Sequence, residues 1–172
     1  AKEVATESKV AEKHILRVFL RNIETDVMLR EALEGHGFTA VRFMNRMVRD
    51  LQEVIDVPPL PAGLEVRPVP ENQYRSVINA LDEAFRDHWG HSPLSDNDYQ
   101  AWSSSPIFKP YLWQVAWDGE EIAAGVLNTV DEEANKQFNL QRGMTDPIFT
   151  RRPWRKRGLA RALLMRSLQM LK

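Results

Sequence analysis

The spacing of hydrophobic residues after position 63 changes along the chain, and these changes divide this part of the sequence into strands and helices. Short runs rich in Val, Leu, Ile and Trp predict β-strands at residues 63–69, 112–117, 121–130 and 145–150. Apolar residues three and four positions apart predict amphipathic helices at residues 72–89, 95–102 and 158–172. Asp118 and Gly119 indicate a tight hairpin, and residues 131–141 are expected to form a polar loop. This order predicts a mixed sheet with helices on its faces, a fold of the α+β or layered α/β class.

The first part of the chain has its own pattern of strand, helix and strand. The strands are predicted at residues 14–22 and 38–48, and the helix between them at residues 25–37. Thr25 is a suitable cap for this helix, and Gly35 or Gly37 is suited to end it. Three such elements are too few to bury both faces of a sheet without a partner.

A stretch rich in proline separates these two parts. Residues 56–63 contain three prolines and a glycine, which cannot sit in a continuous helix or a central strand. We therefore expect a linker at 56–63 between residues 1–55 and residues 64–172.

The composition limits the class of protein and its surroundings. The 172 residues, 43% hydrophobic and 27% charged, suit one globular domain. Because cysteine is absent, disulfides, thiolate metal sites and cysteine nucleophiles are excluded. No apolar run approaches the ~18 residues needed to cross a bilayer, and no charged-then-apolar leader is present. We therefore expect a soluble, cytoplasmic chain without a membrane partner.

Positive charge is concentrated at one end of the sequence. Residues 147–172 hold eight Lys or Arg and no acidic residue, so the remaining residues carry a net charge of −9. The segment RRPWRKRGLARALL, residues 151–164, joins a predicted strand to a predicted helix. A helix start offers unpaired N–H donors and about half a positive charge, which suits a phosphate group. Gly158 lets the backbone approach such an anion. The sequence thus predicts a phosphate cradle, with the basic side chains of residues 155–157 at its rim.

Other uses of this cluster are less well supported. A basic cluster beside a tryptophan can also bind nucleic acid, but the nearly neutral chain and the short reach of a single cluster disfavour that function. The two common nucleotide-binding motifs, Gly-x-x-x-x-Gly-Lys-Ser/Thr and Gly-x-Gly-x-x-Gly, are absent. A kinase or a dinucleotide enzyme is therefore disfavoured.

Pro147 adds a second feature next to the cradle. Proline deletes one donor of a strand ladder, so a central strand at residues 145–150 is expected to part from its neighbour at this point. The gap exposes backbone amides and carbonyls to an extended ligand. The expected ligand is long, carries amides and is phosphorylated at one end.

These residues resemble the GNAT superfamily of N-acetyltransferases, whose pyrophosphate loop has the pattern Gln/Arg-x-x-Gly-x-Gly/Ala. The matching positions are Arg155, Lys156, Arg157, Gly158, Leu159 and Ala160. The resemblance implies that these residues hold the pyrophosphate of acetyl-CoA, the co-substrate, and that Ile148 and Thr150 pair with its pantetheine arm. It also implies a GNAT-like fold, with a mixed, mostly antiparallel sheet flanked by helices.

The first part of the chain resembles the half of a GNAT fold that follows the pyrophosphate helix. Asn22 and the pair Gly37-Phe38 stand at matching positions, and Asn22 is included among the expected cofactor-binding residues. The resemblance implies that residues 1–55 are the C-terminal half of one GNAT-like domain and residues 64–172 the N-terminal half of a domain, in permuted order. This arrangement resembles a tandem-domain protein similar to mycothiol synthase.

Two hypotheses follow for how the halves are completed. In the first, residues 14–50 dock against residues 64–172, either within one chain or by exchange between the chains of a homodimer. In the second, the chain is a piece of a longer tandem protein.

The resemblance implies direct attack of a primary amine, on a small molecule or a peptide, on the acetyl thioester. The family often places a tyrosine acid four residues before the Gly-Phe pair, but Leu33 occupies that position here, so the acid is missing from this segment. Asp146 is the acidic group on the predicted cofactor strand and is the candidate catalytic residue; its structural alternative is a turn carboxylate. A catalytically degenerate acyl-CoA-binding or scaffold domain and a nucleic-acid-binding module are the alternative functions.

Histidine and tryptophan supply the remaining candidates. His88 and His91 have no cysteine or suitably spaced third ligand near them, so we expect no metal site and place them in a substrate-side loop. Acceptor choice is expected to lie in residues 85–102, although the sequence does not name the acceptor. Three tryptophans are expected to be core residues: Trp102, Trp113 and Trp117.

Overall fold

The chain is divided into two compact units, Ala1–Val48 and Arg49–Lys172. The computed structural model describes residues 26–172 of it. The predicted strand at residues 14–22, together with Asn22, lies outside the described residues. Each unit is described here by itself.

The described part of the first unit contains one helix, α1 (Val27–Gly35). Its N-cap is Asp26, where Thr25 was expected, and the Asp26 carboxylate accepts a hydrogen bond from the Leu29 amide at 3.1 Å. The prediction that Gly35 or Gly37 ends the helix is confirmed: Gly35 is its last residue, and Gly37 follows the C-cap with a φ of 83°, where the Phe38 amide donates back to the Leu33 carbonyl at 3.1 Å.

The prediction of a strand at residues 38–48 is wrong. This segment has no strand pairing, and residues 39–48 are exposed. A strand is stabilised by hydrogen bonds to a neighbour, and the described residues pair no other strand with this segment. Its apolar residues alternate only imperfectly, so the local pattern adds little.

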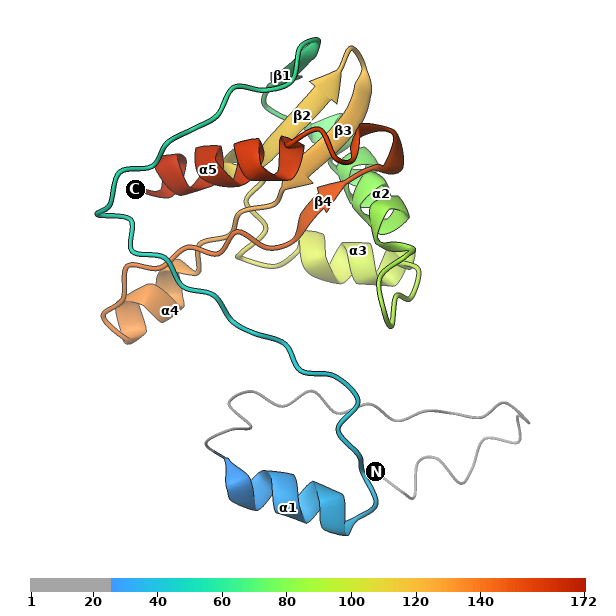
Figure 1. Ribbon diagram of the computed structural model, residues 1–172, viewed down its shortest axis with the longest axis vertical. Helices are drawn as coiled ribbons and strands as arrows, with labels where there is room; N and C mark the ends of the chain where they lie inside the picture. The colour runs from blue at the N-terminus through green and yellow to red at the C-terminus, as the bar shows by residue number, and fades with distance from the viewer. Residues whose placement is uncertain (1–25) are drawn as a thin grey trace, which may run out of the picture. The chain divides into compact units, whose positions relative to one another are not determined.

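The second unit is built on an antiparallel sheet in the order β1-β2-β3-β4 (Figure 1). The strands are β1 (Leu64–Val66), β2 (Gln114–Asp118), β3 (Glu121–Val126) and β4 (Ile148–Thr150). All four strands were predicted, and each is shorter in the structure than in the prediction. The hairpin between β2 and β3 is also confirmed: Asp118 pairs with Glu121, and Gly119 has the positive φ, 57°, that a two-residue turn requires.

The helices of this unit are α2 (Tyr74–Phe85), α3 (Asp96–Ser103), α4 (Glu132–Gln137) and α5 (Leu159–Leu171). Three were predicted, and Ser95 and Asp98 form a reciprocal capping box at the start of α3. The prediction of a polar loop at residues 131–141 is wrong, because this segment contains α4. This short helix buries no residue, so its sequence lacks the apolar residues at helical spacing that would have predicted it. The Asp131 carboxylate caps it by accepting a hydrogen bond from the Ala134 amide at 2.9 Å.

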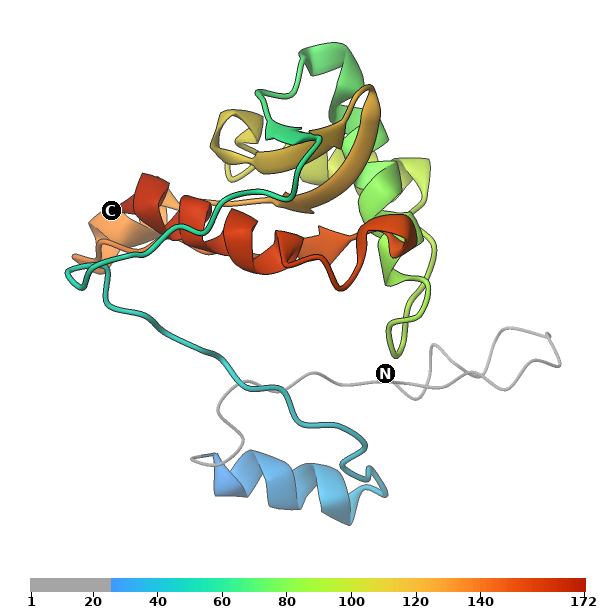
Figure 2. The same ribbon diagram turned by 45° about the horizontal axis from the view of Figure 1, so that its top comes forward.

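Helices cover both faces of the sheet (Figures 1 and 2). One core layer lies between the sheet and α2 and contains Trp117, Ile78 and Phe149. The other lies between the sheet and α5 and contains Leu159 and Leu163. The prediction of core tryptophans is confirmed: Trp113 and Trp117 are buried, and Trp102 is partly buried against the first layer. The two layers fix β4 and the start of α5 relative to each other.

Gly125 in β3 leads to a stability prediction. A Cβ at this position would lie 2.5 Å from Cε1 of Phe149, a buried ring. Gly125→Ala is therefore expected to destabilise the second unit by about 1–3 kcal/mol through overpacking, measured by urea unfolding. Gly143→Ala is the matched control, because its Cβ would meet only the flexible end of Leu171 at 3.0 Å. Equal unfolding free energies for the two variants would contradict the prediction.

Candidate active site

The start of α5 forms a cradle of free backbone donors. Gly158 is the N-cap, and the first intrahelical hydrogen bond joins the Ala162 amide to the Gly158 carbonyl at 3.1 Å. The amides of Leu159, Ala160 and Arg161 precede that bond, so they have no partner inside the helix. Such an array, with the positive end of the helix dipole, favours an anion.

Gly158 is required by its backbone conformation. Its φ is 84°, in the left-handed region, whereas an added Cβ would meet no atom within 4 Å. Space among the protein atoms therefore does not require glycine, but the backbone conformation favours it, because glycine adopts this φ without the strain of an L-residue.

The outer edge of β4 adds a second set of free backbone groups. On its inner side, the Pro147 carbonyl accepts from the Leu127 amide, just after β3, and the Arg151 amide donates to the Ala123 carbonyl in β3, each at 3.0 Å. Because antiparallel strands alternate, the backbone groups of Ile148 and Thr150 face the opposite side. Within residues 26–172 no further strand pairs with that side. The edge can therefore bond an extended, amide-bearing ligand.

A pocket of about 570 Å³ joins the cradle to this edge. The structure brings most of the predicted cofactor residues together in its lining: Ile148, Thr150, Arg155, Lys156, Gly158, Leu159 and Ala160. Arg157 and Asp146 are exposed and do not line it. One continuous pocket thus offers an anion cradle at one end and a strand edge at the other.

Pro147 lies at the inner end of this arrangement, and the structure changes its expected role. It precedes β4, which is an edge strand of the described sheet and not a central one. The ladder of hydrogen bonds is nevertheless interrupted here. Going back along the chain from the Pro147 carbonyl, the next pairing with the segment that follows β3 is an isolated bridge between Met144 and Thr129. Thr145 and Asp146 lie in the interruption.

The chain as a whole matches no protein-family profile and no curated protein sequence. Among solved structures, it matches a GCN5-related N-acetyltransferase from Sphaerobacter thermophilus with a TM-score of 0.57 and 27% sequence identity. The match covers 70% of this chain and 36% of that one, so this chain spans about a third of the length of its structural neighbour.

The second unit has a GNAT-like fold. The predicted fold class, α+β with a mostly antiparallel sheet flanked by helices, is confirmed, and the sheet of the described residues is antiparallel throughout. No helix among the described residues is long and apolar enough to cross a membrane.

In this GNAT-like unit, Arg155 is a structural clamp. Its Nε donates to the Thr150 carbonyl at 3.1 Å, and Nη2 donates to the Ala84 carbonyl at 2.8 Å. Nη1 donates to the Asp87 carboxylate at 3.1 Å. The side chain therefore ties the loop to β4 and to the end of α2, and three of its five N–H donors are occupied before any ligand binds.

Neighbouring arginines are also paired with acids. Arg152 makes a two-point contact with Asp87, and Arg151 makes a 2.9 Å ion pair with Glu83. By contrast, Lys156, Arg157 and Arg161 have no ion pair within residues 26–172. Since Lys156 and Arg161 line the pocket, they are its available cations. The pairing of three arginines leaves less of the cluster for nucleic acid.

Asp87 is a site residue that sequence reasoning missed. It lines the pocket, and its hydrogen bonds to Arg152 and then Arg155 hold the pKa of its carboxyl below the ordinary value of 3.8. The only available signal was an acid at the end of a predicted helix. Nothing local indicated that it pairs with a loop 65 to 68 residues away.

The lowered pKa of Asp87 predicts a pH dependence of stability. A depressed pKa stabilises the fold above the unfolded-state pKa, and this contribution is lost as the pH falls through the folded-state value. The unfolding free energy of the wild type is therefore expected to exceed that of Asp87→Asn by a constant amount from pH 7 to about pH 4, and by less below pH 4. Urea unfolding of both proteins across this range tests it; a difference that persists unchanged to pH 2 would contradict it.

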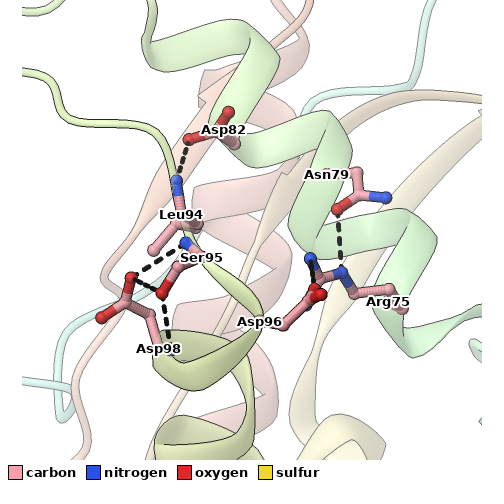
Figure 3. A network of polar contacts seen from close by, with 7 residues as sticks. All are labelled: Arg75, Asn79, Asp82, Leu94, Ser95, Asp96 and Asp98. Carbon is pink, nitrogen blue, oxygen red and sulfur yellow. Dashed lines mark hydrogen bonds and ion pairs between the residues drawn. The ribbon is translucent and has the colours of Figure 1, made fainter.

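The α2–α3 loop, residues 86–95, also carries His88 into the pocket lining. Its far end is held by Asp82, which accepts from His91 Nε2 at 2.9 Å and from the Leu94 amide at 3.1 Å. Figure 3 shows the Asp82–Leu94 contact beside the pair Arg75–Asp96, which joins α2 to α3 at 2.8 Å. Among the described residues, no group of three or more side chains is arranged to hold a metal ion.

Proposed function

We propose that this chain is part of a GNAT-type N-acyltransferase that uses acetyl-CoA and transfers the acetyl group to a primary amine of a small molecule or peptide. The observation that carries the proposal is the single pocket that joins the α5 cradle to the free edge of β4. CoA has the matching form, with a doubly charged pyrophosphate at one end of an arm that carries amides.

The residues present fit this co-substrate. The amides of Leu159, Ala160 and Arg161 suit the pyrophosphate, with Lys156 as an added cation. Ile148 offers both backbone groups to the arm, and Thr150 offers its amide, because Arg155 occupies the Thr150 carbonyl. Electrostatic attraction and strand-like pairing would therefore orient the arm along β4, with its thioester away from the cradle.

Acetyl transfer in such a site proceeds by direct attack. The nitrogen of a neutral amine bonds to the thioester carbonyl carbon, the carbon–sulfur bond breaks, and the nitrogen loses a proton. Asp146, the predicted catalytic residue, is exposed in the ladder interruption. It stays a candidate for orienting the amine.

We also propose that residues 1–55 supply the second half of a GNAT-like domain, in a tandem protein similar to mycothiol synthase or through exchange of half-domains in a homodimer. Support comes from apolar side chains of the first unit that are between 70% and 93% exposed: Val41, Phe43, Met44, Met47 and Val48. Exposed apolar groups of this density need a partner surface. A cooperative thermal unfolding of both units together would support completion of the fold by this chain or its homodimer. An unfolded first unit in circular dichroism and NMR spectra would contradict that version and favour the longer tandem protein.

Calorimetric titration of the chain with acetyl-CoA and with CoA tests the proposed function. Saturable binding is expected for both ligands, with competition by 3′,5′-ADP, which lacks the arm. Binding followed by thiol release in the presence of a panel of amines supports a transferase. Binding without transfer to any amine favours the degenerate acyl-CoA-binding domain, and absence of saturable binding rejects both.

A further inference from the structure

We infer that His88 is the proton acceptor of the acyl transfer, the residue that removes the proton from the acceptor amine. This inference rests on the proposed function. It assigns the base role to a residue on the α2–α3 loop and not to the cofactor strand.

His88 has the right place in the molecule. It follows the end of α2 and lines the same pocket as Ile148 and Thr150, whose backbone groups form the free edge of β4. Its side chain is exposed, so an amine can reach it from solvent. An arm bound along β4 and an amine entering at this wall would meet inside one pocket.

The hydrogen bonding of the ring leaves one nitrogen ready to accept a proton. Nδ1 of His88 lies 3.1 Å from the Trp89 carbonyl oxygen, which can only accept. Nδ1 therefore carries the hydrogen, and in the neutral ring Nε2 has the free lone pair. No hydrogen bond within residues 26–172 occupies Nε2. This is the arrangement of a general base whose tautomer is fixed by a carbonyl.

The ring and its loop are held in place before a ligand binds. The ring packs on Phe85 with centroids 5.2 Å apart, and the His88 amide donates to the Phe85 carbonyl at 2.7 Å. Asp87 fastens the near end of the loop to the two arginines, and Asp82 fastens the far end (Figure 3). A preorganised base loses little entropy in the transition state.

The other polar side chains of the lining are unsuited to this step. Asp87 is bound to Arg152 and Arg155, which lower its pKa and make it a weak base. Lys156, Arg155 and Arg161 are cations, and Thr150 is a weak base. Histidine is the lining residue type whose neutral form is both common and basic near neutral pH.

The step balances as follows. The amine nitrogen bonds to the thioester carbon, the carbon–sulfur bond breaks, and CoA leaves as a thiolate. The proton lost by the nitrogen passes to Nε2, which gives an imidazolium. The imidazolium then returns the proton to solvent or to the thiolate, so no oxidant, reductant or further reactant is needed.

The test compares His88→Gln and His88→Ala with the wild type, and uses His36→Gln, at the C-cap of α1, as the matched control. We expect His88→Gln to bind CoA with a Kd within about threefold of wild type, because the cradle and β4 edge are unchanged. Its kcat with the best amine is expected to fall by about 100-fold or more, the usual effect of losing a general base. Added imidazole is expected to restore part of the kcat of His88→Ala, which a merely structural role would not permit.

The outcomes separate this inference from the proposed function. If the wild type transfers acetyl groups and His88→Gln keeps its kcat, His88 is not the base, while the acyltransferase function stands. If the variants lose CoA affinity or stability, rescue of His88→Ala by imidazole supports the base role and its absence overturns it. If the wild type binds no CoA, or binds it and acetylates no amine, the proposed function fails and the base role fails with it.

Discussion

Replacing Gly158 by glutamate is expected to weaken CoA binding by at least about 100-fold, close to 2.7 kcal/mol. Gly158 lines the pocket, and a Cβ at this position meets no atom within 4 Å, so the glutamate side chain can leave the backbone freely and fold over the start of α5. There it would accept hydrogen bonds from the free amides and place a negative charge where the pyrophosphate binds. Isothermal titration of the variant with CoA measures the loss.

The control separates this effect from backbone strain. Gly158→Asn puts a shorter, uncharged side chain at the same φ of 84°, which asparagine tolerates better than most residues. It is expected to retain most of the CoA affinity, with a stability cost below about 1 kcal/mol. Equal CoA affinities for Gly158→Glu and wild type would refute the assignment of the cradle.

Features that depend on neighbouring residues were predictable from the sequence. The hairpin at Gly119, the capping box of Ser95 and Asp98, and the helix end at Gly37 each arise from contacts within about five residues. The residues that form them are therefore close together in the sequence, and a short stretch is enough to predict each feature. The cradle at Gly158 belongs to the same class, since it needs only a strand end, a glycine and a helix start.

Features that depend on distant partners were not predictable. The strand expected at residues 38–48 had suitable composition but no neighbour to pair with in the described residues. Pro147 predicted a central strand that parts from its neighbour, whereas β4 is an edge strand of the described sheet and the proline precedes it. In both cases, strand pairing over long range decided the result.

The role of the arginines could not be predicted for the same reason. Charge density pointed to Arg155 as part of the rim, but its partners are the carbonyls of Ala84 and Thr150 and the carboxylate of Asp87. Two of these partners lie on or just beyond α2, far away in the sequence. The sequence shows where cations are concentrated, and tertiary structure decides which of them remain available to a ligand.

Arg155 and Arg157 therefore give a matched pair of variants within one loop. Arg155→Ala removes two hydrogen bonds to carbonyls and leaves the partly buried Ala84 carbonyl without its donor. We expect a loss of roughly 2 kcal/mol in unfolding free energy. We also expect about tenfold weaker CoA binding, because the loop is no longer fixed to β4 and α2. Arg157→Ala, exposed and without an ion pair in residues 26–172, is expected to change stability by less than about 0.5 kcal/mol.

Arg155→Lys distinguishes geometry from charge. Lysine keeps the positive charge but has one nitrogen in place of a planar fork, so it cannot reach Thr150, Ala84 and Asp87 together. It is expected to behave like Arg155→Ala in urea unfolding and in CoA titration. If charge alone governed the loop, Arg155→Lys would match the wild type, and Arg155→Ala would match Arg157→Ala. Either result would show that the clamp does not position the cradle.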